Sequence, residues 1–396
     1  MEWSRGGSPP PCARPVADRY GDEPSAHARV ASWGMSFLDA GPPLESPRHG
    51  VGRSTLLLVD AARADRLVPI DVWYPAAPGA PGARSQYELL PGVGFTATAA
   101  ADAAISDGRH PLVLWSHGRT ATRSTYALLC EALAARGFVV IAPEHAGDAL
   151  GDWILGAAVD DETNEKNRVA DAHLVLNTVL GGSGPLAAIA AHVDLDRIAA
   201  AGHSYGGFTA LSVASGETAH PSVRAAAGMQ AFTRSMPKQV FEYISIPTLL
   251  VAGMQDATTP PATDADRAWA KLAAHPAWRV DVERAGHQAC SDVGLYLELA
   301  PKVEAIPEIV EQFVRSMAAD ITGIAGDPWR DTVALHVRIL GAFLDGALGI
   351  DVETAHRELA AIHELDGVTV ASRGSFAVLR SPLRSAGSAP TVRRSR

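Results

Sequence analysis

The chain has 396 residues, of which 47% are hydrophobic and 20% are charged. This composition is typical of a folded globular protein and excludes an intrinsically disordered one. The formal net charge of -10 at pH 7 argues against an extended basic face, so we expect no nucleic-acid partner. The three cysteines, Cys12, Cys130 and Cys290, provide no disulfide framework, and no cysteine or histidine cluster indicates a metal site.

One catalytic domain, residues 51–350, is predicted between two extensions. Residues 1–50 are rich in proline and glycine and contain no continuous apolar stretch, so a flexible extension without a signal peptide or membrane anchor is expected. Residues 351–396 form the second extension. From Arg373 onward it has six arginines and no acidic residue, which favours a solvated terminus, with an anionic docking segment as the alternative. The expected location is the cytoplasm, and no integral membrane segment is expected.

Strand and helix patterns alternate along the domain. Residues 54–60 and 67–74 predict an antiparallel hairpin at the N-terminal edge of a sheet. Further strands are expected at 111–115, 138–142, 197–201, 223–228, 248–252 and 278–283, and helices at 124–136, 164–180, 208–213, 262–274 and 331–348. This alternation predicts an α/β fold, with a mostly parallel twisted sheet and helices on both faces.

A glycine-framed serine follows one of these strands. Residues 202–207 read Gly-His-Ser-Tyr-Gly-Gly directly after the apolar stretch 197–201, and a helical pattern follows. This is the strand–turn–helix context of the G-x-S-x-G nucleophile elbow of α/β-hydrolases. A side chain at Gly202 or Gly206 would collide with the neighbouring backbone in so tight a turn. Ser204 is therefore the candidate nucleophile, and an ordinary turn serine is the alternative.

A serine hydroxyl needs a base to take its proton, and the base needs a third group to orient it. Asp256 comes shortly after the expected strand 248–252, and His287 comes directly after the last expected strand, 278–283. The order serine, acid, histidine is the chain order of α/β-hydrolases, and both positions lie on the edge where parallel strands end. The alternatives are a turn or capping aspartate and an unrelated loop histidine.

The oxyanion hole of such a site needs two backbone N–H groups. One is expected from Tyr205, which follows the nucleophile. The other is expected from Arg119, in the loop 116–119 that reads Ser-His-Gly-Arg after the expected strand 111–115. His117, in the same loop, is a candidate pocket residue, and packing within the loop is its alternative role.

Further pocket residues are expected in two longer segments and one turn. Residues 147–163 carry the apolar side chain of Trp153, and residues 290–327 lie between the candidate base and the last expected helix. Either segment provides a lid or an acyl-binding wall, or packs on the core. His145 follows the expected strand 138–142 and is a candidate pocket residue, with a structural role as the alternative.

Several of these motifs resemble a known family. The Ser-His-Gly turn at 116–118, the stretch 136–145 (Arg-Gly-Phe-Val-Val-Ile-Ala-Pro-Glu-His), the elbow, Gly286-His287-Gln288 and the hairpin segment 68–75 resemble the platelet-activating-factor acetylhydrolase-like branch of the α/β-hydrolases. Its bacterial members are often labelled predicted dienelactone hydrolases. The resemblance covers roughly residues 50–350 and implies an esterase that releases short or oxidised acyl chains from lipids, or hydrolyses related small esters. Bacterial polyester hydrolases are similar in the same segments.

The chain departs from this family in two places. In the animal plasma enzymes the acid follows the preceding strand, where this chain reads Gly-Met-Gln-Ala-Phe at 228–232 without a carboxylate. Asp256 instead stands at the position used by most α/β-hydrolases and by the bacterial polyesterases. True dienelactone hydrolases use a cysteine nucleophile, whereas this chain has Ser204.

The sequence therefore predicts a serine carboxylic-ester hydrolase that forms an acyl-enzyme on Ser204 and needs no cofactor. A small-molecule or lipid ester is the expected substrate, in particular a short-chain acyl ester or a lipid acetyl ester. A polyester hydrolase or cutinase-like enzyme and a serine peptidase are alternatives, although about 50 N-terminal residues are too few for the propeller of prolyl-oligopeptidase-like enzymes. An α/β-hydrolase-fold binding module without catalysis is the alternative from another class, and the presence of a serine, an acid and a histidine argues against it. The sequence predicts no oligomeric state.

Overall fold

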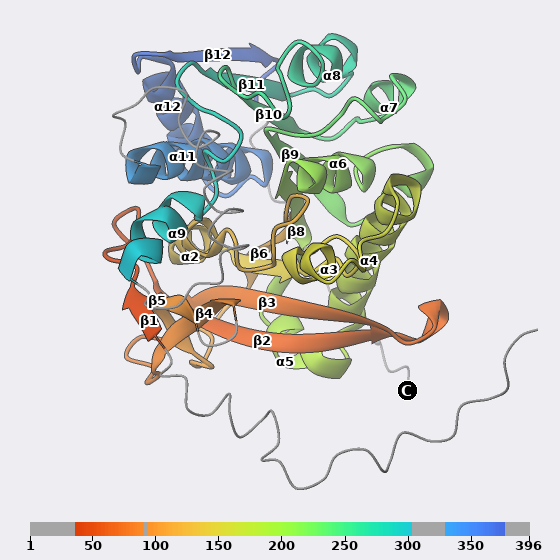
Figure 1. Cartoon of the computed structure of the whole chain (residues 1–396). Coiled ribbons are helices and arrows are strands. Elements are labelled where there is room, and N and C mark those ends of the chain that lie inside the picture. The colour runs from red at the N-terminus through yellow and green to blue at the C-terminus, as the bar shows by residue number, and fades with distance from the viewer. Residues whose placement is uncertain (1–35, 91–92, 303–328, 377–396) are drawn as a thin grey trace, which may run out of the picture.

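The computed structural model describes residues 36–90, 93–302 and 329–376. Within these residues twelve strands form one sheet, in the order β1-β5-β2-β3-β7-β6-β8-β9-β10-β11-β12, with β4 paired to β5 (Figure 1). The strands from β7 through β6, β8, β9 and β10 to β11 are parallel. Helices cover both faces (Figure 1). The predicted α/β fold is confirmed.

The elements have the following bounds. The strands are β1 (Ser36–Asp39), β2 (Gly50–Asp60), β3 (Arg66–Ala76), β4 (Arg84–Leu90), β5 (Val93–Ala101), β6 (His110–Ser116), β7 (Val139–Pro143), β8 (Val193–His203), β9 (Val223–Met229), β10 (Thr248–Gly253), β11 (Ala277–Val282) and β12 (Val368–Arg373). The α-helices are α2 (Ala127–Arg136), α3 (Leu150–Ile154), α4 (Asp161–Gly181), α5 (Ala187–Ala190), α6 (Tyr205–Ser212), α7 (Gln239–Glu242), α8 (Ala265–Lys271), α9 (Val293–Leu299), α11 (Trp329–Ala347) and α12 (Val352–His363).

The central strands are buried on both faces, which is why they read as continuous apolar runs. In β6, Val113 and Trp115 pack with residues of α2 and α11, whereas Leu112 and Leu114 pack with residues of α4 and α5. Successive side chains of a strand point to opposite faces, so one short strand supplies both layers of the core. The sheet is therefore held rigidly between two layers of helices, and its strand ends are fixed positions for a site.

The antiparallel hairpin predicted near the N-terminus is present as β2 and β3. It does not lie at the edge of the sheet, because β5 pairs with β2, and β1 and β4 pair with β5. The prediction of an edge hairpin missed these three strands. Their residues partly belong to the segment 1–50, which we expected to be a flexible extension. Residues 1–35 of that segment lie outside the described residues.

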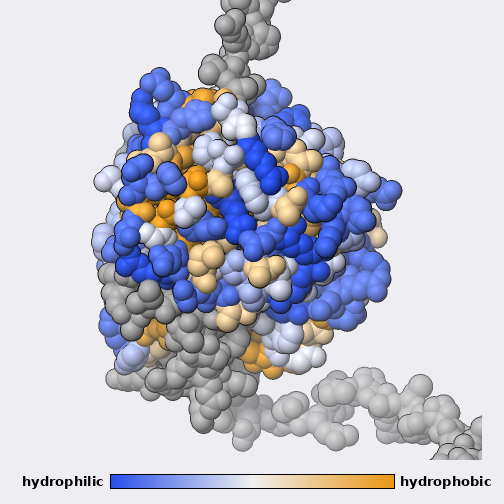
Figure 2. All heavy atoms as spheres, turned by 90° about the horizontal axis from the view of Figure 1, so that it is seen from above, coloured by the Kyte–Doolittle hydropathy of each residue, from blue (hydrophilic) through white to orange (hydrophobic). Residues whose placement is uncertain are grey.

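The other end of the sheet is also longer than predicted. Residues 352–363 form α12 and residues 368–373 form β12, which pairs antiparallel with β11. The segment assigned to a C-terminal extension thus contributes a helix and a strand to the fold. Figure 2 looks onto this end of the molecule and shows a surface of mostly hydrophilic residues with smaller apolar areas. The basic tail, from residue 377 onward, lies outside the described residues.

Within the described residues no single helix has the length and apolar character needed to cross a bilayer, although the bent pair of α4 and the segment Gly184–Ala190 has both when the two are taken together.

Candidate active site

The turn between β8 and α6 holds Ser204 in a strained conformation. Its φ of 55° and ψ of -119° are unusual for a residue with a side chain, at a cost of about 1–3 kcal/mol. A Cβ atom on Gly206 would lie 1.8 Å from the carbonyl oxygen of Ser116, and one on Gly202 would lie 2.4 Å from the backbone of Gly206. Glycine is required at both positions because backbone approaches backbone. Ser204 itself is only 6% exposed.

His287 and Asp256 form a buried hydrogen-bonded pair. The Nδ1 atom of His287 lies 2.8 Å from Oδ2 of Asp256, and each residue is 4% exposed. Because a carboxylate only accepts, Nδ1 carries the proton and Nε2 is left as the basic nitrogen. Asp256 also accepts hydrogen bonds from the backbone N–H groups of Thr258 (2.8 Å) and Thr259 (2.7 Å) and from the Thr259 hydroxyl (2.6 Å).

These hydrogen bonds keep Asp256 ionised. Burial opposes the charged form, but the hydrogen bond and charge of His287, together with the bonds from Thr259, outweigh it and hold the pKa of Asp256 below its ordinary value. The imidazole of His287 therefore has a negatively charged partner at Nδ1. This charge would stabilise a proton taken up at Nε2.

His203, the residue before the candidate nucleophile, joins the two halves of the site. Its Nε2 donates to the carbonyl of His287 at 2.6 Å, and its Nδ1 accepts from the Tyr126 hydroxyl at 2.7 Å. Burial, followed by the charge of His287, lowers the pKa of His203 to about 3, so it is neutral at physiological pH. The sequence pattern indicated no role for His203 or Tyr126, because the G-x-S-x-G motif leaves the residue before the serine unspecified and does not include Tyr126.

The two expected oxyanion donors belong to segments that adjoin the serine. Tyr205 is the first residue of α6, so its N–H is one of the helix donors without an acceptor inside the helix. Gly118 packs against the nucleophile, since a Cβ atom added there would lie 3.2 Å from the Cβ of Ser204. Arg119 follows directly, and its N–H belongs to the peptide unit that joins it to Gly118. The N–H of Gly118 is already used in a 3.3 Å hydrogen bond to the Tyr126 hydroxyl.

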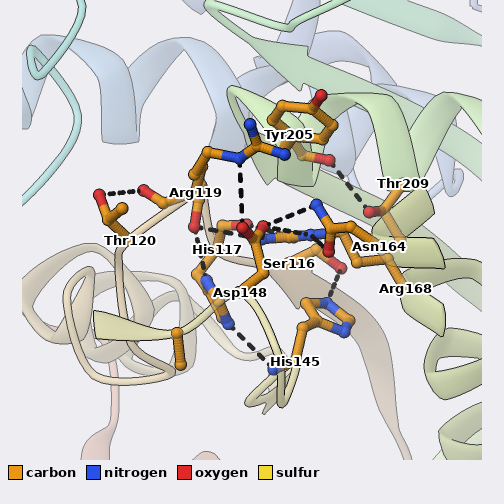
Figure 3. Close-up of polar contacts among 12 residues, drawn as sticks. Ser116, His117, Arg119, Thr120, His145, Asp148, Asn164, Arg168, Tyr205 and Thr209 are labelled. Carbon is orange, nitrogen blue, oxygen red and sulfur yellow. Dashed lines mark hydrogen bonds and ion pairs between the residues drawn. The ribbon is translucent and has the colours of Figure 1, made fainter. Parts of the chain in front are cut away.

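His117 and His145, the candidate pocket residues, are both fully buried and take part in the hydrogen bonds around the loop 116–119 (Figure 3). The backbone N–H of His145 donates to Nε2 of His117 at 3.0 Å, and Nδ1 of His117 donates to the Gly118 carbonyl at 2.7 Å. His145 Nδ1 lies 3.1 Å from Asp171. Burial lowers the pKa of both imidazoles, that of His145 to about 4. Both side chains support the loop from within.

Arg119, Trp153 and Tyr205 form a cationic and aromatic rim beside the elbow. The guanidinium carbon of Arg119 lies 4.4 Å from the Tyr205 ring centre and 5.5 Å from that of Trp153. Trp153 is 42% exposed, and Tyr205 stacks on Phe232 with ring centres 4.4 Å apart. Arg119 also contacts Asp148 and Asp161, which balance its charge. Tyr205 is only 5% exposed, with Arg119 and Phe232 against its ring, so the exposed aromatic surface of this rim belongs to Trp153.

The segment 290–327, the other expected wall of the pocket, is described only in part. Of the segment 290–327, α9 and the turn up to Lys302 are described, and residues 303–328 lie outside the described residues. Among the residues that are described, no group of three or more histidine, cysteine, aspartate or glutamate side chains is arranged to hold a metal ion.

Comparison with known proteins places this geometry in a family. A ferulic acid esterase from Streptomyces cinnamoneus superposes with a TM-score of 0.61 at 26% identity, over 78% of this chain and 93% of that chain. The likeness supports an esterase of the α/β-hydrolase superfamily and does not single out the platelet-activating-factor acetylhydrolase-like branch. The model of the PET hydrolase-like family matches residues 93–299, which include Ser204, Asp256 and His287. This match covers just over half of the chain, and the protein therefore belongs to the PET hydrolase-like family.

Proposed function

We propose that the protein is a serine carboxylic-ester hydrolase that forms an acyl-enzyme on Ser204. The observation that carries the proposal is the combination of the strained elbow at Ser204 with the buried 2.8 Å hydrogen bond between His287 and Asp256. A strained turn and a pre-oriented imidazole are both costly to build, and general-base activation of a serine uses both.

In the proposed reaction, His287 Nε2 takes the proton from the Ser204 hydroxyl while Oγ attacks the ester carbonyl carbon. The negative charge that forms on the carbonyl oxygen accepts hydrogen bonds from the N–H groups of Tyr205 and Arg119. The imidazolium, stabilised by Asp256, then gives its proton to the departing alcohol. A water molecule attacks the acyl-enzyme by the same route, which releases the acid and restores the serine.

Two substrate classes are compatible with this site. Short-chain acyl esters are the class that the sequence favours. Esters of aromatic acids, including polyesters, are supported by the exposed ring of Trp153 next to Arg119 and by the family and the ferulic acid esterase neighbour. A flat aromatic acyl group would stack on Trp153, whereas a short aliphatic acyl chain would make little contact with that ring.

A panel of p-nitrophenyl esters from acetyl upward, with methyl ferulate and bis(2-hydroxyethyl) terephthalate, tests both statements. Ser204→Ala is the blank, and an organophosphonate probe should add its mass to the peptide that contains Ser204. Turnover that persists in the blank would contradict the mechanism. A kcat/KM for the aromatic esters that exceeds that for p-nitrophenyl acetate would favour the second class, and Trp153→Ala should then reduce that preference.

A further inference from the structure

One arginine inside the protein contacts the loop that carries the proposed oxyanion donor. Arg168 lies on α4, is fully buried, and approaches the loop 116–119 from within (Figure 3). Its Nη1 donates to the carbonyl of His117 at 2.7 Å, and its Nη2 lies 3.3 Å from the carbonyl of Gly118. We propose that Arg168 is a positioning residue, which orients the two peptide units of this loop for ester hydrolysis.

The guanidinium is itself held in one orientation. Its Nε and Nη2 donate to the same carboxylate oxygen of Asp148, at 3.0 and 2.6 Å, and Asn164 accepts from Nε at 3.1 Å. Asn164 also donates to Asp148 at 2.9 Å, so the arginine, the asparagine and the aspartate form a closed set of hydrogen bonds. A planar fork with several fixed partners transmits geometry better than the point charge of a lysine would.

This arrangement determines where the loop's N–H groups point. In a trans peptide unit the C=O and the N–H point in opposite directions. Arg168 holds the carbonyl of His117, and the N–H of the same unit, that of Gly118, bonds to Tyr126. The carbonyl of Gly118 is held by Arg168 and by His117 Nδ1, so the direction of the Arg119 N–H is fixed as well.

The positive charge has a second effect on the same donor. A cation at the carbonyl oxygen of Gly118 polarises that peptide unit and makes its N–H, on Arg119, a stronger donor. Asp148 compensates the charge, so the arginine remains ionised although burial lowers its pKa. The fixed direction and the polarisation of the Arg119 N–H both matter most when negative charge develops on the substrate oxygen. We therefore expect the loss of Arg168 to lower kcat more than it changes KM.

The inference rests on the proposed function, and a thionoester distinguishes positioning from mere structural support. When sulfur replaces the carbonyl oxygen, the substrate is a weak acceptor and gains little from oxyanion donors. Arg168→Met should lower kcat for an oxoester about 30-fold or more with a much smaller change in KM. The same substitution should lower kcat for the matching thionoester only a few-fold. The ratio of the oxoester kcat to the thionoester kcat therefore falls.

Arg136→Met is a matched control, since Arg136 is also largely buried and paired, with Asp345 and Glu358, but contacts a different part of the fold. It should leave the ratio of oxoester to thionoester rates as in the parent chain. Arg168→Lys keeps the charge without the fork and should give an intermediate ratio. If Arg168→Met does not fold, the lysine variant, checked by circular dichroism, decides alone.

Equal losses for both esters in a folded Arg168 variant, or an unchanged oxoester kcat, would overturn the positioning role. Phosphonate labelling of Ser204 in the parent chain separates this outcome from failure of the proposed function. If the parent chain is labelled and active while the ratio stays unchanged, only the role of Arg168 is lost. If the parent chain has no Ser204-dependent turnover, both proposals are overturned.

Discussion

Ser204, Asp256 and His287 are the residues that sequence reasoning reached first, since motif, order along the chain and strand ends all pointed to them. The structure brings His287 and Asp256 together at 2.8 Å and fills the alternative acid position with Gln230, whose amide contacts His336. The sequence could not reveal Arg168 or Tyr126 as site residues. Both act through contacts between segments 50 or more residues apart in the chain, for which no local pattern exists.

Ser204→Ala is predicted to lower kcat/KM for a reactive ester by about 10⁴-fold or more, because a methyl group offers no nucleophile. The fold should be retained, since the strained backbone is kept and alanine is the smaller residue. Initial rates of ester hydrolysis at substrate concentrations well below KM, with thermal unfolding in parallel, provide the measurement. Activity above about one per cent of the parent value would show that Ser204 is not the nucleophile.

Asp256→Asn is predicted to lower kcat by about 10³–10⁴-fold, because an amide can donate to Nδ1 and so favour the wrong imidazole tautomer. Asp264→Asn is the control: Asp264 is equally buried but is bonded to Thr233 and Arg234 and not to the imidazole. The control should keep most of its kcat. Similar losses in both variants would mean that Asp256 acts on stability alone.

Among the elements, the bounds of the strands that are buried on both faces were predicted within a few residues. A short continuous apolar run between turn residues is typical of such a strand. The element β5 was missed although Phe95, Ala97 and Ala99 are buried in alternation. Its sequence, Val-Gly-Phe-Thr-Ala-Thr-Ala-Ala-Ala, contains mostly small residues, and alanine favours a helix locally. The sheet contacts that override this preference come from the preceding strand β4 and from β1 and β2, which lie far away in the chain.

The close approach of α6 to the end of β6 leads to a prediction at the level of elements. Gly206→Ala would place a Cβ atom 1.8 Å from the Ser116 carbonyl oxygen, so the two elements must separate. We expect a loss of unfolding free energy of about 3 kcal/mol or more, together with loss of activity. Gly151→Ala in α3, where a Cβ meets nothing within 4 Å, should be neutral or stabilising. Equal denaturation midpoints for the two variants would contradict this packing.

At the scale of the whole molecule, four fully buried histidines, His117, His145, His203 and His336, connect stability to pH. Burial lowers the pKa of each below the ordinary value. Between the folded and the ordinary pKa, these histidines are therefore protonated in the unfolded chain and neutral in the folded chain. Their contribution to stability is complete above about pH 6.5 and declines as the pH falls towards the folded values. Asp292 and Asp345 oppose this trend, since burial raises their pKa.

His336 isolates one of these contributions. Its Nδ1 donates to the Thr332 carbonyl at 2.7 Å and its Nε2 accepts from the Gln230 amide at 2.9 Å, so both nitrogens are bonded in the neutral form. Burial lowers its pKa to about 4. His336→Asn should therefore reduce the pH slope of the unfolding free energy between pH 4 and 6.5 by up to about 1.4 kcal/mol per pH unit. Urea unfolding at several pH values measures the slope, with His363→Asn as a surface control. A slope equal to that of the parent chain would mean that the folded protein already protonates His336, which would require a different hydrogen-bond arrangement around Gln230.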